Sequence, residues 1–128
     1  MLFYRAALLS LVIFLLAAPL GAAYQPQVIH GDILEVHQEE GKVRIASSAG
    51  MLILELASPC RIVRGRQEVS VAALRPIQQG WYQDGLFVLN SAGQAVEIIV
   101  SYAIREEDGF LVLYDIFGNI KMREPLER

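Results

Sequence analysis

The sequence predicts an all-β fold, a small antiparallel β-barrel with one short helical turn and a C-terminal β-hairpin. First, apolar runs rich in β-branched residues, such as 51–56 and 96–100, recur between glycine or acidic breaks about every ten residues, which is typical of antiparallel strands. Second, one segment interrupts this rhythm: Ser70 can cap a helical turn, and Pro76 stops its extension. A barrel is favoured because closure removes exposed strand edges, and an open sandwich is the alternative.

Residues 1–23 are typical of a cleaved secretion signal. Arg5 precedes a short apolar run, 6–18, which ends at Pro19 and is followed by small residues that a signal peptidase accepts. We therefore expect the mature chain to begin at Tyr24 and to work outside the cytoplasm, secreted or periplasmic. An uncleaved anchor is the alternative, because the apolar stretch approaches the roughly 20 residues that cross a bilayer. Membrane contact is expected only in that case.

The remaining residues, 24–128, have the composition of one globular domain. The chain has 11 basic and 14 acidic residues, and only Arg5 lies in the leader, so the mature charge is about −4. A domain of this size buries about two thirds of its unfolded surface, enough for one core without metals or disulfides. Cys60 is the only cysteine, so no internal disulfide forms. We expect an inert, partly buried thiol, with an intermolecular bridge as the alternative.

Each predicted strand is an apolar run bounded by turn residues, and the strands lie at about 28–37, 42–47, 51–57, 60–64, 86–91, 95–103, 110–116 and 119–123. Turns that contain a glycine, which can adopt positive φ, are predicted at 39–41, 48–50, 64–66 and 91–93. Segment 76–85 is predicted as a loop, or as a strand with a loop. The C-terminal hairpin, about 110–123, extends the barrel or covers its open end. The charged end, 124–128, has little to bury and is expected to fray.

Four structural motifs carry a resemblance to a known group of domains. They are His30-Gly31-Asp32-Ile33 with Val36, Lys42-Val43-Arg44-Ile45 with Met51-Leu52-Ile53-Leu54, Val63-Arg64-Gly65-Arg66, and the helical turn 70–74. In this order they resemble small secreted bacterial domains of unknown function with an OB-like β-barrel. The resemblance implies an OB-like barrel and no catalytic residues. The segment around Trp81 and the hairpin from Phe110 lie outside it.

The candidate ligand-binding residues are a basic cluster and two nearby aromatics: Arg61, Arg64, Arg66, Trp81 and Tyr82. OB-like barrels bind oligonucleotides or oligosaccharides, and a local basic cluster in an acidic chain would suit an anionic polymer. The net negative charge argues against nucleic acid. Ordinary surface arginines and aromatics that plug one end of the barrel are the favoured interpretation of these residues, and Arg64→Ala is expected to leave stability almost unchanged.

His30 and Asp32 lie two positions apart on a predicted strand, so both face the same way and could contribute to a metal site. No third ligand lies at a suitable spacing, so surface or hydrogen-bonded roles are favoured, and neither a metal nor a cofactor is expected. The pairs Glu39-Glu40 and Glu106-Glu107 lie in turn-like contexts where neighbouring side chains diverge. We interpret them as solvated carboxylates.

No catalytic motif follows the leader, so the sequence ranks function classes rather than choosing one. The favoured class is a non-enzymatic binding or assembly module of a bacterial envelope, whose partner is an envelope protein or an anionic polymer. The alternatives are a glycan or anionic-polymer binder that uses the basic and aromatic residues, and an enzyme whose site the sequence does not connect. An exposed apolar patch would favour protein assembly, and titratable groups converging in a pocket would favour an enzyme.

Overall fold

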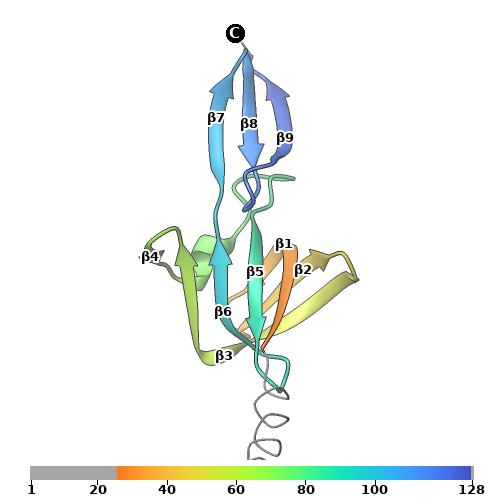
Figure 1. Ribbon diagram of the computed structural model, residues 1–128, viewed down its shortest axis with the longest axis vertical. Helices are drawn as coiled ribbons and strands as arrows, with labels where there is room; N and C mark the ends of the chain where they lie inside the picture. Colours follow the sequence, from red (N-terminus) through yellow and green to blue (C-terminus); the bar gives the residue numbers. More distant parts are fainter. Residues whose placement is uncertain (1–25, 128) are drawn as a thin grey trace, which may run out of the picture.

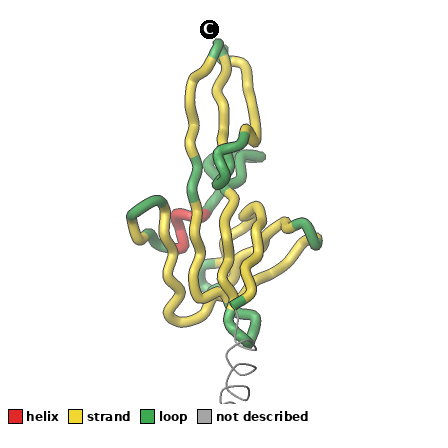
Figure 2. Tube along the Cα trace, in the orientation of Figure 1, coloured by secondary structure: helices red, strands yellow, loops and turns green. Residues whose placement is uncertain are grey.

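The computed structural model describes residues 26–127, which are almost entirely β-structure, as the sequence predicts (Figures 1 and 2). The predicted leader lies outside the described residues. In chain order the elements are β1 (Gln27–His37), β2 (Lys42–Ser47), β3 (Gly50–Arg64), β4 (Gln67–Glu68), the 3₁₀ turn η1 (Val71–Leu74), β5 (Asp84–Leu89), β6 (Ala95–Val100), β7 (Ala103–Glu107), β8 (Phe110–Tyr114) and β9 (Ile120–Pro125).

Five strands close into the predicted OB-like barrel. The order is β2-β1-β5-β6-β3, and an additional pairing of β2 with β3 completes the ring. Strands β3 and β6 run parallel, and the other neighbours in the ring are antiparallel. The helical turn η1 lies between the third and fourth barrel strands, at the position where the sequence predicts one.

Strand β3 closes the barrel because it is long enough to serve two neighbours. Its first part, from Gly50 to Glu55, pairs with β2, and its last part, from Arg61 to Arg64, pairs with β6. The apolar pattern predicts two strands here, 51–57 and 60–64, and this division is wrong. The division falls where the β3–β6 register shifts, between Leu56 and Arg61, so the break lies in the pairing and not in the strand.

The barrel core follows the alternation that the apolar runs predict. Along β2, Val43 and Ile45 are fully buried, whereas Arg44 between them points outward. The core cluster takes one or more residues from every barrel strand and from η1: Ile33, Val43, Ile45, Leu54, Ile62, Leu74, Phe87, Leu89, Ala95, Ile98 and Val100. The helical turn therefore contributes through Leu74, which covers one side of the core.

Two buried glycines allow β1 and β5 to lie close to their other neighbours. Gly31 and Gly85 are directly opposite each other in the β1–β5 pair. A Cβ atom on Gly31 would lie 2.9 Å from the carbonyl oxygen of Ala46, and one on Gly85 would lie 3.1 Å from Cγ1 of Val100. Because backbone cannot move as a flexible side chain can, any larger residue at Gly31 would disturb the barrel end at which the C-terminal sheet is attached.

The C-terminal part is a three-stranded sheet in the order β7-β8-β9, which projects from one end of the barrel (Figure 1). Only the β8–β9 hairpin is predicted from the apolar pattern, with the preceding strand extended to 103 and Glu106-Glu107 in a turn-like context. In the structure β6 ends at Val100, and those two glutamates lie in β7. The turn is one step later, at Asp108 and Gly109, whose φ angles of 52° and 81° suit a two-residue type I′ hairpin.

The chain end is also more ordered than the sequence predicts. Pro125 is the last residue of β9, and the N–H of Leu126 donates a hydrogen bond of 2.9 Å to the carbonyl oxygen of Gly109. The tip of the sheet therefore joins the β7–β8 turn to the end of β9. Figure 1 shows this tip at the far end of the molecule from the barrel.

Substitution of a core position in β2 should unfold the barrel. Ile45→Asp places an unpaired charge at a fully buried site, and we expect a loss of more than about 4 kcal/mol in the free energy of unfolding. Ile53→Asp is the matched control, because Ile53 is 67% exposed on the neighbouring strand, and it should change stability by less than about 0.5 kcal/mol. Urea unfolding followed by circular dichroism measures both. Equal stability of the two variants would contradict the core assignment.

Candidate functional site

The one charged side chain that is fully buried within residues 26–127 belongs to Asp84, the first residue of β5. Its side chain is 1% exposed, and its Oδ2 atom lies 2.7 Å from Nε2 of His30 on β1. Both carboxylate oxygens accept a hydrogen bond of 3.2 Å from the backbone N–H of Ile116, in the loop between β8 and β9. A barrel carboxylate therefore holds a loop of the C-terminal sheet.

Lys121 of β9 adds a second link between the sheet and the barrel. Asp32 lies directly opposite Asp84 in the β1–β5 pair, where two like charges repel. Lys121 Nζ lies 2.5 Å from Oδ1 of Asp32 and 3.9 Å from Oδ1 of Asp84, and it also donates a 2.7 Å hydrogen bond to the carbonyl oxygen of Tyr82. One cation from the C-terminal sheet thus offsets the repulsion between two barrel aspartates.

The loop that reaches Asp84 is braced from within by Asp115. Its side-chain Oδ1 accepts hydrogen bonds of 2.9 Å from the N–H of Phe117 and of 2.8 Å from the N–H of Asn119. This arrangement is a local Asx turn. It presents the Ile116 N–H to Asp84 and places the Phe117 ring against His30, with 4.9 Å between the ring centroids.

His30 and Asp32 share one face of β1, as the sequence predicts, and both are hydrogen-bonded. Their partners could not be read from spacing, because Asp84 is 54 positions from His30 and Lys121 is 89 positions from Asp32. Across the described range 26–127, no three His, Cys, Asp or Glu side chains group closely enough to hold a metal ion. The polar atoms of this cluster are directed at one another, so its physical role is to fix the sheet on the barrel.

A second polar network surrounds Gln83, which is 2% exposed. Its Nε2 atom donates hydrogen bonds of 2.8 Å to the carbonyl oxygens of Ala73 and Arg75, at the end of η1. Arg64 donates 2.8 Å to Oε1 of Gln83 and 2.6 Å to the oxygen of Ala73, and its guanidinium lies 4.8 Å from the ring centre of Tyr102. This network holds η1 against β3 and β5.

The five sequence-predicted binding residues do not lie together on one exposed surface. Arg64 is directed into the network around Gln83, and Trp81 is 4% exposed. Tyr82 is partly buried, and its carbonyl group accepts from Lys121. The other two arginines are exposed: Arg66 lies in a turn, and Arg61 forms ion pairs of 3.7 Å with Glu68 and 3.8 Å with Glu97.

This placement also changes the expectation for Arg64. A side chain that donates to two partly buried acceptors contributes to the stability of the fold, so a neutral effect of Arg64→Ala no longer follows. Burial of Trp81 agrees with the favoured interpretation of a packed aromatic, although Trp81 lies outside the main core cluster.

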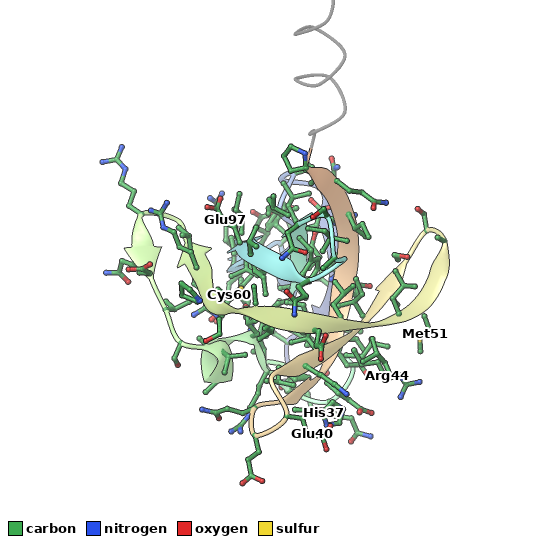
Figure 3. The ribbon with its side chains drawn as sticks, turned by 90° about the horizontal axis from the view of Figure 1, so that it is seen from below. His37, Glu40, Arg44, Met51, Cys60 and Glu97 are labelled. Carbon is green, nitrogen blue, oxygen red and sulfur yellow. The ribbon has the colours of Figure 1, made fainter. Side chains whose placement is uncertain are left out.

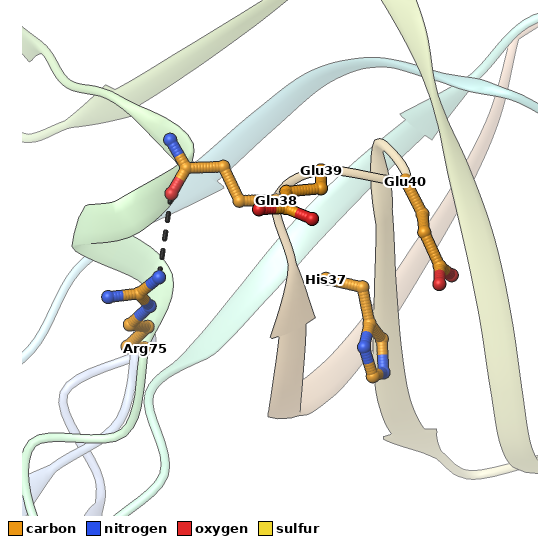
Figure 4. A pocket seen from close by; sticks show the side chains of 5 residues that line it. All are labelled: His37, Gln38, Glu39, Glu40 and Arg75. Carbon is orange, nitrogen blue, oxygen red and sulfur yellow. Dashed lines mark hydrogen bonds between the residues drawn. The ribbon is translucent and has the colours of Figure 1, made fainter.

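A cavity of about 330 Å³ lies beside the β1–β2 turn. Figure 4 shows its lining side chains, with Arg75 donating a long hydrogen bond of 3.5 Å to Oε1 of Gln38. Glu39 and Glu40 line it and are exposed, as expected for solvated carboxylates. His37 also lines it, and its Nε2 atom lies 3.1 Å from Oε2 of Glu35. The cavity is polar and open.

The C-terminal sheet has one face that is covered by its own side chains. Tyr114 donates a 2.6 Å hydrogen bond to Glu107, and Val112 on the same face is fully buried. The guanidinium groups of Arg105 and Arg123 lie 5.6 Å and 5.2 Å from the ring centres of Tyr114 and Phe110. The pKa of Tyr114 is raised above its ordinary value, mainly by the hydrogen bond to Glu107.

The opposite face is the apolar part of this sheet. Strand register places Ile104, Leu113 and Met122 in one row across it, and Glu106, Leu111 and Glu124 in the next row. Leu113 is buried, whereas Ile104 and Met122 are 36% and 37% exposed. With Phe117 and Ile120 at the base, this sheet and its loop hold four of the seven large apolar side chains that are exposed in the described chain.

The chain matches no protein-family model, and neither a curated protein nor a solved structure matches it. The resemblance to secreted OB-like domains therefore stays a prediction. Over the described residues, no helix has the length and apolar character needed to span a bilayer.

Neutralising the buried carboxylate should loosen the attachment of the C-terminal sheet. Asp84→Asn keeps the size of the side chain but removes the charge that faces His30 and, at longer range, Lys121, and we expect a loss of about 1–3 kcal/mol in unfolding free energy. Amide exchange of Ile116 should accelerate in parallel. Asp108→Asn is the control, since asparagine tolerates the positive φ of that exposed turn. Equal protection of the Ile116 amide in both variants would refute the attachment.

The Cys60 thiol should react slowly. Cys60 is partly buried in β3 and lies near Glu97 of β6 (Figure 3); burial first, and the Glu97 charge second, raise the pKa of Cys60 above its ordinary value. Because the thiolate is the nucleophile, iodoacetamide at pH 8 should alkylate the folded protein more slowly than a free cysteine. Glu97→Gln should lower the pKa of Cys60 and speed alkylation, whereas Glu55→Gln should not. An unchanged pH profile in Glu97→Gln would contradict this account.

Proposed function

We propose that this chain is a non-enzymatic assembly module of a bacterial envelope, and that a partner protein docks on its C-terminal sheet. The single observation that carries the proposal is the concentration of exposed apolar side chains on that sheet and its loop. Clustered apolar exposure on an otherwise well-packed domain marks a surface for protein contact. The proposed localisation outside the cytoplasm is inferred from the leader-like segment 1–23 alone.

The attachment of the sheet supports the same role. The Asp84 and Lys121 contacts fix the base of the sheet on the barrel, while the sheet itself extends away from it (Figure 1). A partner would meet a surface that is already in position, which lowers the entropic cost of binding. The titratable groups around Asp84 are paired with one another, which favours an architectural role over an enzymatic one.

The charge of the sheet favours a protein partner over an anionic polymer. Glu106 and Glu124 flank the apolar row and would repel a polyanion, and the inward direction of Arg64 removes one cation from the basic cluster. An envelope protein with a complementary apolar patch would cover the exposed apolar row, and it need not carry the negative charge that these glutamates repel.

The test is affinity capture of the tagged full-length protein from its native envelope, with mass spectrometry of what it retains and of its own N-terminus. We expect one defined partner and an N-terminus at Tyr24. Ile104→Lys should reduce capture by at least about tenfold, because it places a charge in the apolar row. Ile53→Lys, at an exposed apolar site on the barrel, should retain capture.

Melting temperatures of the two variants establish that both fold. Loss of the partner in Ile53→Lys but not in Ile104→Lys would move the docking surface to the barrel and overturn the proposal. An uncleaved N-terminus would overturn the assignment of a processed, exported chain.

A further inference from the structure

Within residues 26–127, three strands of this protein have only one neighbouring strand. Every barrel strand has a neighbour on each side, because β2 and β3 close the ring, although Gly50–Glu55 of β3 pair with β2 alone. The strands that have only one neighbour are β4, β7 and β9, and β4 is two residues long. Of these three strands, β7 and β9 are long enough to receive another strand.

The β9 edge carries the features by which proteins block strand addition. Pro125 has no N–H to donate, and Lys121 is already committed to Asp32 and to the carbonyl of Tyr82. The β8–β9 pair also contains a register shift between Leu113 and Tyr114. Proline, lysine and bulges all protect an edge from pairing.

The β7 edge has none of these features. The strand contains no proline or lysine, and its pairing with β8 is regular. In a two-residue hairpin the flanking residues, Glu107 and Phe110, form the hydrogen-bonded pair that closes the turn. Alternation along an antiparallel pair then directs the N–H and C=O groups of Ile104 and Glu106 outward, away from β8. These groups form an open template for another strand.

The side chains at this edge specify what could be added. Ile104 belongs to the apolar row with Leu113 and Met122, and Glu106 belongs to the acidic row with Glu124. A strand laid against β7 would place one side chain beside Ile104 and the side chain two positions away beside Glu106. An apolar residue suits the first place, and a basic residue suits the second.

We propose that β7 accepts an extended segment of the partner protein as a fourth, antiparallel strand, with an apolar residue opposite Ile104 and a basic residue opposite Glu106. Main-chain hydrogen bonds supply the attachment, and the two side-chain places supply selectivity, as in other complexes formed by strand addition. This inference rests on the proposed function, because it assumes that the partner docks on the C-terminal sheet. It adds the mode of docking and the chemistry of the docked segment.

The probe is an acetylated and amidated peptide, Thr-Lys-Thr-Val-Thr-Val, titrated into the ¹⁵N-labelled protein. Paired antiparallel, its lysine lies opposite Glu106 and its first valine opposite Ile104. We expect the largest amide shifts at Ile104 and Glu106, with little change along β9. N-methylation of that valine should abolish binding because its N–H faces β7, whereas N-methylation of the preceding threonine, whose N–H faces away, should not.

The charge preference is tested by reversing charges in the peptide and in the protein. A peptide with glutamate in place of lysine should bind roughly tenfold more weakly, since like charges directly opposite each other destabilise a strand pair. Glu106→Lys should reverse this preference. Glu124→Lys changes a carboxylate in the same row at the far edge, and it should leave the preference unchanged.

The outcomes separate this inference from the proposed function. Shifts centred on β9, equal tolerance of the two N-methylated peptides, or no binding at millimolar peptide would overturn strand addition. If Ile104→Lys still abolishes partner capture in that case, the assembly function stands and only the mode of docking fails. The last experiment measures the oligomeric state of the protein alone by sedimentation. If the protein is a dimer, and if Glu106→Lys dissociates it, the β7 edge pairs with a second copy of this chain. That result would overturn the proposed partner.

Discussion

The position of the C-terminal sheet depends on the buried carboxylate of Asp84. A carboxylate that is 1% exposed is costly unless its oxygens are hydrogen-bonded and its charge is balanced. His30, Lys121 and the Ile116 N–H together meet this need, and two of those three groups come from the C-terminal sheet and its loop. The loop that covers this carboxylate thus also supplies its hydrogen bonds, so polar contacts specify where the sheet lies.

This mode of attachment explains how a small sheet can remain exposed on most sides. Within the described range no strand of the sheet pairs with a barrel strand, so its register is set by its own turn and its own side chains. Val112 on one face and Leu113 on the other are buried, and strand register places Arg105 opposite the first and Ile104 opposite the second. Three strands with small cores on both faces are near the minimum that is independently stable, and the anchor at Asp84 supplies the rest.

The barrel could be predicted from the sequence because its signals are local. Strand β2 occupies the predicted residues 42–47, since apolar and polar residues alternate there between two glycine-containing turns. Strand β7 could not be read from alternation, because its sequence, Ala-Ile-Arg-Glu-Glu, is mostly charged. The signal that would have found it is the Asp108-Gly109 pair, which is the strongest short hairpin signal when strand-forming residues flank it.

The candidate site was less predictable, because burial and partners are set by the tertiary fold. Nothing about Arg64 in the sequence separates it from Arg61 and Arg66, yet only Arg64 faces the buried amide of Gln83. In the same way, nothing in the sequence distinguishes Asp84 from other loop aspartates, yet its carboxylate lies under the β8–β9 loop.

The strand edges of this fold differ in how well they are protected from pairing, and this difference indicates a binding partner. Barrel closure joins the two outer edges of the five-stranded sheet, β4 is kept to two residues, and β9 ends in proline with its lysine already paired. In the same sheet as β9, β7 is left regular and open, without proline, lysine or a bulge, beside an apolar row that is partly exposed. An unprotected edge carries a risk of aggregation, which a docked partner strand would remove. The contrast between β7 and β9, two edges of one small sheet, is therefore better explained by a partner than by poor packing.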